Sequence, residues 1–156
     1  PDLILGGEAM KAALAVLEPA LQAAGQERKV LGTVVLGTVK GDIHEIGKAL
    51  VGSMLSANGF LVHDVGIDVE ADEFVAQARE HNADIVALSA LLTTTMLHQR
   101  EVIEHLAEAG LRERVKVMVG GSPVTQAWAD EIGADGFAED AASAAVVAKR
   151  LMGIQA

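Results

Sequence analysis

Residues 30–57 have the sequence VLGTVVLGTVKGDIHEIGKALVGSMLSA. The first part, 30–39, is apolar apart from glycines and threonines, which is typical of a β-strand buried on both faces of a sheet. For the last part, 45–57, we predict a helix that ends at Asn58-Gly59. Residues 38–44 then join a strand to a helix, and this order predicts the first half of a parallel βαβ unit.

The same alternation continues to the end of the chain. The predicted strands are 60–65, 84–89, 115–119 and 136–137, and the predicted helices are 70–81, 95–109, one from Ser122-Pro123 onward, and 141–152. Five strands alternating with helices predict an α/β fold with a doubly wound, flavodoxin- or Rossmann-like parallel sheet. In a flavodoxin-like strand order, ligands bind at the carboxyl ends of the first and third strands. The loops 38–44 and 89–95 should therefore carry the site.

The segment before this sheet has a different pattern. Residues 8–24 predict an amphipathic helix, and a polar linker follows at 25–29. The apolar residues on one face of that helix are Met10, Leu14, Leu17 and Leu21. We therefore divide the chain into residues 1–28 and an α/β domain at 29–156. Because the chain begins with Pro1 rather than Met, we expect it to be trimmed or incomplete.

The composition excludes several classes of function. The chain has 156 residues and a net charge of −10, so it should repel phosphate backbones and not bind nucleic acid. It has no cysteine, which rules out disulfides, thiolate metal sites and iron–sulfur clusters within it. This fits a reducing compartment, and we expect a cytoplasmic location. The apolar stretch 30–39 is much shorter than the roughly 20 residues of a membrane span, so we expect no membrane insertion.

The loop after the first strand contains the residues with the most distinctive chemistry. His44 lies at the ligand end of the predicted sheet, and imidazole is a common ligand of transition metals. Asp42 is two residues earlier and can reach the second ring nitrogen, where it would fix the tautomer, raise ligand basicity, and take up or release a proton. Gly41 and Gly47 remove side chains where a bulky ligand would approach the backbone. The simpler alternatives are a loop histidine that caps a helix and an aspartate that stabilises a turn.

Three motifs in this order resemble a known family. Residues 42–47 (D-I-H-E-I-G), 89–91 (S-A-L) and Gly120-Gly121 are similar to the D-x-H-x-x-G, S-x-L and G-G signature of cobalamin-binding domains. The surrounding sequence resembles the corrinoid proteins of methyltransferase systems and the cobalamin domain of methionine synthase. Residues 5–21 resemble the last helix of the four-helix cap that precedes the domain in those proteins, so we interpret 1–28 as a remnant of that cap.

The resemblance implies a cobamide cofactor (cobalamin or a related corrinoid) in its methylated form. His44 would be the lower axial ligand of cobalt and Asp42 its hydrogen-bond partner, and the hydroxyl of Thr95 would complete the relay. Further residues expected to contact the cofactor are Gly41, Ile43, Glu45, Gly47, Ser89, Leu91, Thr93, Gly120, Gly121 and Ala141. Some of these have simpler explanations, since Ser89 could end a strand, Thr95 could cap a helix and the glycine pair could form a tight turn.

For function, the resemblance implies a methyl carrier whose cobalt alternates between methyl-Co(III) and Co(I). Such a protein is not a complete enzyme. Its expected partners are a substrate-specific methyltransferase subunit, an acceptor methyltransferase that uses tetrahydrofolate or a thiol, and a reductive activator. A homo-oligomer is compatible with this role.

Other functions have sequence features that differ from these. Adenosylcobalamin-dependent isomerases usually have D-G-H-D-R-G and no preceding cap helix, whereas this chain has Ile43 and a cap-like segment. A cobalamin-dependent sensor would follow a DNA-binding module, and no basic segment is visible. A receiver or flavodoxin-like domain would need an acidic cluster or a phosphate-binding first loop, which 38–44 does not offer.

Two departures from the family pattern have consequences. Glu45 and Ala49 stand where family members commonly have Asp and Asn, with small expected effects. With only one cap helix, the upper face of the corrin would be exposed or covered by another subunit. Elsewhere, His98, Glu101 and His105 share one face of a predicted helix, which we interpret as a solvated face rather than a metal site.

Overall fold

The computed structural model describes residues 11, 15 and 29–154. Its strands are β1 (Thr33–Val39), β2 (Leu61–Val69), β3 (Ile85–Ser89), β4 (Lys116–Gly120) and β5 (Gly136–Ala138), and its helices are α2 (Ile46–Ala57), α3 (Ala71–Glu80), α4 (Leu97–Glu108), α5 (Gln126–Ile132) and α6 (Ala141–Leu151). Apart from residues 11 and 15, the helix predicted at 8–24 lies outside the described residues, as does the division after residue 28.

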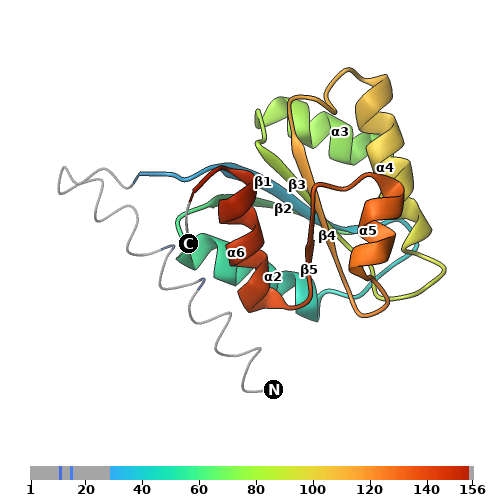
Figure 1. Ribbon diagram of the computed structural model, residues 1–156, viewed down its shortest axis with the longest axis horizontal. Coiled ribbons are helices and arrows are strands. Elements are labelled where there is room, and N and C mark those ends of the chain that lie inside the picture. Colours follow the sequence, from blue (N-terminus) through green and yellow to red (C-terminus); the bar gives the residue numbers. More distant parts are fainter. Residues whose placement is uncertain (1–10, 12–14, 16–28, 155–156) are drawn as a thin grey trace.

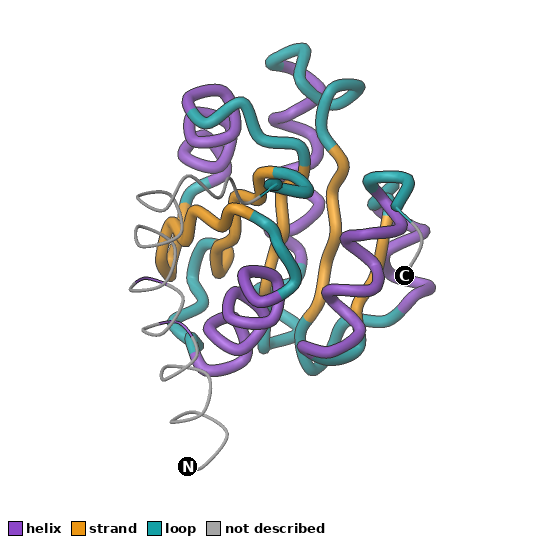
Figure 2. Tube along the Cα trace, turned by 90° about the vertical axis from the view of Figure 1, so that its left-hand side faces the viewer, coloured by secondary structure: helices purple, strands orange, loops and turns teal. Residues whose placement is uncertain are grey.

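The strands form one parallel sheet in the order β2-β1-β3-β4-β5 (Figure 1). This order confirms the predicted doubly wound, flavodoxin-like fold, with the strand order reversing between β1 and β3. Helices cover both faces of the sheet (Figure 2). α2 and α6 pack side by side on one face, and α3, α4 and α5 cover the other.

The two cores follow from the alternation of side chains along each buried strand. On the α2 and α6 face the strands contribute Val34, Leu36, Ile85, Ala87 and Met118. On the opposite face they contribute Val35, Val39, Val86, Leu88, Val117 and Val119. The central strands are therefore apolar on both sides, which explains their nearly continuous runs of Val, Leu and Ile.

Two strand boundaries differ from the prediction by more than one residue. β1 begins at Thr33 rather than at residue 30, since the preceding residues bond the turn after α2, where the Leu31 N–H donates to the Gly59 carbonyl over 3.0 Å. β2 continues to Val69 instead of ending at residue 65, because its pairing with β1 resumes beyond a register shift at Gly37. Gly66 and Asp68, residue types that are rare in strands, conceal this extension in the sequence, and Asp68 lies beside the functional loop.

The start of α5 was also wrong in the prediction. Ser122-Pro123 lie in a turn closed by the Val124 N–H donating to the Gly121 carbonyl over 3.0 Å. The helix begins later, and Thr125 caps it by accepting the Trp128 N–H over 3.1 Å. The tight turn after β4 therefore uses the Ser-Pro pair that resembled a helix start. In the part of the chain described, no helix is both long and apolar enough to cross a membrane.

Candidate functional site

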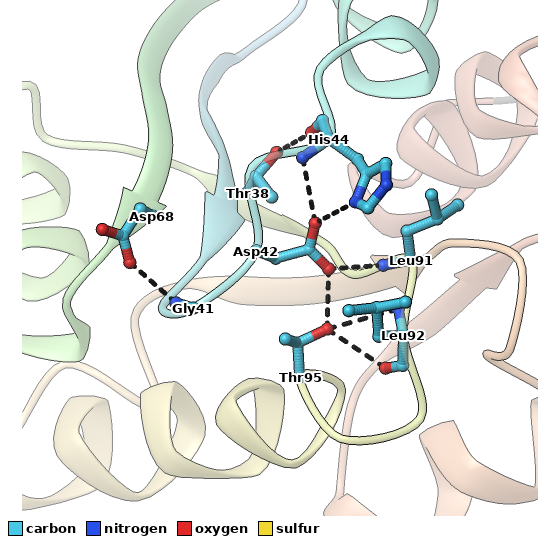
Figure 3. Close-up of polar contacts among 8 residues, drawn as sticks. All are labelled: Thr38, Gly41, Asp42, His44, Asp68, Leu91, Leu92 and Thr95. Atoms are coloured by element: carbon cyan, nitrogen blue, oxygen red, sulfur yellow. Dashed lines mark hydrogen bonds and ion pairs between the residues drawn. The ribbon is translucent and has the colours of Figure 1, made fainter.

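Asp42 is the centre of a hydrogen-bond network at the carboxyl ends of β1 and β3 (Figure 3). One carboxylate oxygen accepts the His44 backbone N–H over 3.0 Å and lies 2.9 Å from His44 Nδ1. The other oxygen accepts the Leu91 N–H over 2.7 Å and the Thr95 hydroxyl over 2.6 Å. The side chain is fully buried. Asp42 therefore ties the loop after β1 to the loop after β3.

These contacts favour the charged form of Asp42. Burial alone would raise its pKa, but the hydrogen bonds from Thr95, from the Leu91 and His44 N–H groups and from the His44 ring outweigh it and hold the pKa well below its usual range. A carboxylate can only accept, so the proton of this contact lies on Nδ1 of His44, and in the neutral ring the free lone pair is that of Nε2. The His44 side chain is 49% exposed, so the ring is oriented from behind and accessible in front.

The backbone of the loop is fixed from both sides. Thr38, the penultimate residue of β1, donates its hydroxyl to the His44 carbonyl over 2.9 Å. Asp68, in the extension of β2, accepts the Gly41 N–H over 2.7 Å and donates its own N–H to the Asp42 carbonyl over 2.9 Å. Gly41 and Asp68 both have left-handed backbones, with φ of 80° and 51°. Sequence reasoning missed Asp68, since no local pattern shows that it lies beside a loop so far away in the chain.

A cavity of about 310 Å³ opens beside His44, between the sheet, α2 and α6. The central strands contribute Leu36, Ala87, Met118 and Gly120 to its lining, and the helices contribute Gly47, Lys48, Leu50, Val51, Ala141 and Ala144. Most of these side chains are apolar or small. The cavity is therefore suited to an aromatic or aliphatic group that extends from a ligand bound at His44.

The predicted site residues fall into three groups. The cavity is lined by His44, Gly47, Ser89, Leu91, Gly120, Gly121 and Ala141. Asp42 and Thr95 are buried behind His44 and do not line it. The other predicted contacts, outside the cavity and exposed to solvent, are Gly41, Ile43, Glu45 and Thr93.

Thr95 does not cap α4. The helix begins at Leu97, its capping position is Met96, and no side chain bonds its first turn there. The Thr95 hydroxyl donates to Asp42 over 2.6 Å and accepts the Leu92 N–H over 3.3 Å, and the Leu92 carbonyl oxygen lies 3.1 Å away. The geometry therefore favours a role toward Asp42 over the capping alternative.

The glycines at the site have different physical roles. A Cβ added to Gly47 would meet no atom within 4 Å, so its absence leaves open space at the cavity. Gly121 has φ of 130°, and a Cβ there would lie 1.7 Å from the Ala90 carbonyl oxygen. A Cβ on Gly120 would lie 3.1 Å from the Ala138 carbonyl oxygen. The close approach of two backbones thus requires glycine at residue 121 whether or not a ligand is bound.

Lys48 is a charged residue of the cavity wall that sequence reasoning did not single out. Its side chain is fully buried, and Nζ lies 2.5 Å from a carboxylate oxygen of Asp64 and 3.8 Å from one of Glu45. Asp64 also accepts the Gly66 N–H over 2.9 Å. A buried ammonium needs such a partner, and this pair fixes the first turn of α2 against β2.

The donor set fits a metal that brings most of its own ligands. His44 offers a single nitrogen at the mouth of an apolar cavity, and no cluster of three or more His, Asp or Glu side chains among the described residues could hold an ion. His98 and His105 each pair with one carboxylate, Glu101 and Asp72, over 2.7 Å. A cobalt ion held in a corrin ring, with a tail long enough to enter the cavity, meets these conditions.

Comparison with known proteins identifies the family. The family model described as "B12 binding domain" matches residues 32–146. The chain belongs to the B12-binding domain family. The resemblance carried by the three motifs is confirmed, and the cofactor of this domain is a cobamide with its cobalt.

Relatives of this B12-binding domain include corrinoid proteins. The chain is 55% identical to dimethylamine corrinoid protein 2 of Methanosarcina acetivorans over 152 residues, which cover 97% of this chain and 70% of the relative. The structure of the Methanosarcina barkeri monomethylamine corrinoid protein is similar with a TM-score of 0.73 and 43% identity, covering 93% of this chain and 68% of that one. A chain of the methanol:cobalamin methyltransferase complex from the same organism has a TM-score of 0.82 and 34% identity, covering 92% and 55%.

Proposed function

We propose that this protein is the methyl carrier of a cobamide-dependent methyltransferase system, with His44 as the lower axial ligand of cobalt. The observation that carries the proposal is the His44–Asp42 contact of 2.9 Å, which leaves Nε2 free at the mouth of the cavity. The relatives named as methylamine corrinoid proteins support the choice of methyl transfer.

In this proposal the residues behind the metal set the orientation of its ligand. Asp42 holds the proton of His44 at Nδ1 and so directs Nε2 outward, and a partner of this kind also strengthens an imidazole as a ligand. Thr95 and the Leu91 N–H hold the other oxygen of Asp42. When bound, the corrinoid would supply a cobalt centre that can carry a methyl group between two partners, and His44 would hold that cobalt.

The cavity is the proposed place for the nucleotide tail of the cofactor. Ser89 and Leu91 would contact the tail on the β3 side, and Gly120, Gly121 and Ala141 would contact it on the β4 and α6 side. The exposed residues Gly41, Ile43, Glu45 and Thr93 would face the corrin ring. The support for this assignment is that His44 and the cavity share one opening.

The proposal includes partners. A methyltransferase subunit is supported by the related protein whose solved structure is a methanol:cobalamin methyltransferase complex. An acceptor methyltransferase that uses tetrahydrofolate or a thiol, a reductive activator and a homo-oligomer remain predictions, as does a cytoplasmic location. We also keep the interpretation of residues 1–28 as a cap remnant as part of the proposal.

The test uses the full chain loaded with methylated cobamide. Wild-type protein should retain the cofactor through gel filtration and transfer its methyl group when mixed with a purified methylamine- or methanol-specific partner and an acceptor methyltransferase. His44→Ala should keep some cofactor through the cavity but change its visible spectrum, since the axial nitrogen is lost. His98→Ala, which changes a histidine paired with Glu101 on α4, is the matched control and should behave as wild type. A spectrum of His44→Ala identical to that of wild type would reject the proposed ligand.

A further inference from the structure

The floor of the cavity consists of two rows of side chains that cross the sheet. In the deeper row Leu36, Ala87 and Met118 are direct neighbours on β1, β3 and β4. In the outer row, two residues further along each strand, Ser89 and Gly120 are neighbours. Side chains two residues apart point to the same face of a sheet, so both rows lie under α2 and α6. The strand lining of the cavity is thus Ser89 and Gly120 near the mouth and apolar side chains deeper inside.

The deeper row offers no hydrogen-bonding edge to a ligand. β1, β3 and β4 are all interior strands, and the register pairs each residue of this row with a neighbour on both sides. The backbone N–H and C=O groups there are used by the sheet. The three side chains are hydrocarbon except for the thioether of Met118, a weak acceptor.

The remaining walls follow the same gradient. Toward the sheet interior α2 contributes Leu50 and Val51 and α6 contributes Ala144. Among the polar lining residues, Ser89, Ser122 and Glu139 lie at or just after the ends of strands. His44, Lys48 and Asp140 are already paired. No buried side-chain nitrogen or oxygen in the described chain lacks a hydrogen-bond partner. The described lining therefore offers no unpaired buried side-chain donor or acceptor to a polar group of the ligand.

We propose that this cavity selects cobamides by the class of their lower base, accepting bases of the benzimidazole type and disfavouring purines. The inference rests on the proposed function, in which His44 displaces the base and the tail enters the cavity. The base is the free end of that tail and therefore reaches the deeper row. Benzimidazole and adenine share an imidazole ring and differ in the outer ring, which is a carbocycle in the first and carries ring nitrogens and an amino group in the second.

Adenine would bury its polar outer ring against Leu36, Ala87 and Met118 without partners. An unpaired polar group costs enough that we expect a benzimidazolyl cobamide to bind roughly tenfold or more tightly than an adeninyl cobamide. Benzimidazole is the more basic nitrogen ligand, so it also holds cobalt more firmly in the free cofactor. Releasing the base from cobalt therefore costs more for the benzimidazolyl cobamide, so this step cannot be the source of a preference for benzimidazole.

The experiment measures dissociation constants of the full chain for three Co(II) corrinoids under anaerobic conditions, by visible absorbance. These are a benzimidazolyl cobamide, an adeninyl cobamide and cobinamide, which lacks the tail. The same measurements are made on Met118→Gln, which places an amide in the deeper row, and on Met54→Gln, the same change on α2 outside the cavity lining. Differences between the free cofactors cancel when the affinity ratio is compared between variants.

We expect the preference for benzimidazole in wild type and Met54→Gln, and a preference several-fold smaller in Met118→Gln. Equal or tighter binding of the adeninyl cobamide by wild type overturns the inference but leaves the proposed function intact. An unchanged preference in Met118→Gln means that the cavity is not where selection occurs and also overturns it. Binding of none of the three corrinoids refutes the proposed function and this inference with it. The wild-type comparison decides the matter even if Met118→Gln does not fold.

Discussion

Replacing Thr95 by valine removes the hydroxyl that holds Asp42 and keeps the shape of the side chain. The hydroxyl is buried and donates to the Asp42 carboxylate over 2.6 Å. A hydrogen bond to a charged group contributes about 1.5–3 kcal/mol, so Thr95→Val should lower the free energy of unfolding by about that amount. For a domain of this size each kcal/mol corresponds to roughly 2–4 °C in Tm. Thr95→Ser keeps the hydroxyl and should lose much less.

A double-mutant cycle with Asp42→Ala, which removes the acceptor, separates this bond from the contacts of Thr95 with Leu92. Urea unfolding of the four proteins gives the coupling free energy between the two side chains. If Thr95 acts through Asp42, most of the cost of Thr95→Val disappears in the Asp42→Ala background. The reasoning is refuted if Thr95→Val is as stable as Thr95→Ser, or if its full cost persists without the carboxylate.

Three further predictions follow from other contacts. Asp68→Ala removes the acceptor of the Gly41 N–H and places alanine at φ of 51°, so it should lower both the cobamide affinity and the free energy of unfolding. Asp68→Asn tolerates this backbone and keeps an acceptor, so it should lose less in a cobamide titration and in urea unfolding. Asp64→Ala should lower the free energy of unfolding more than Lys48→Met does, because it leaves a fully buried ammonium without its main partner, whereas Lys48→Met leaves a carboxylate that is partly exposed to water. The reverse order in urea unfolding would contradict this prediction. The hydrogen bond with Asp72 raises the pKa of His105 despite partial burial. The pair therefore stabilises the fold below the unfolded-state pKa of about 6.5, and this stabilisation is lost as pH rises through the folded-state pKa. NMR titration should show a lower His105 pKa in Asp72→Asn than in wild type.

The features that the sequence predicts well are those set by neighbouring residues. Asp42 and His44 are two positions apart, and a non-helical loop between a strand and a helix brings the carboxylate to the ring. The doubly wound parallel sheet follows from the alternation of apolar strands and helices, whereas the order β2-β1-β3-β4-β5 comes from the structure. Thr95 could be placed only through the family resemblance, because its contact with Asp42 joins two loops that are distant in the chain.

The features that the sequence conceals depend on long-range pairing. β2 continues past Val65 through Gly66 and Asp68, which are rare in strands, and only the register with β1 brings Asp68 to the functional loop. Lys48 has the appearance of a solvated helix residue until α2 is packed on the sheet with Asp64 beside it. The requirement for glycine at residue 121 comes from the Ala90 backbone, which no local pattern places there.

The central claim is a bond between Nε2 of His44 and cobalt, and electron paramagnetic resonance of the Co(II) form tests it most directly. Protein labelled with ¹⁵N in histidine alone and loaded with unlabelled cobamide should show each cobalt line split into a doublet by ¹⁵N. Unlabelled protein should show the triplet, or threefold splitting, that ¹⁴N gives. His98→Ala should retain that change and His44→Ala should lose it. A splitting that stays threefold in labelled wild-type protein would contradict the account, because the axial nitrogen would then belong to the cofactor and not to His44.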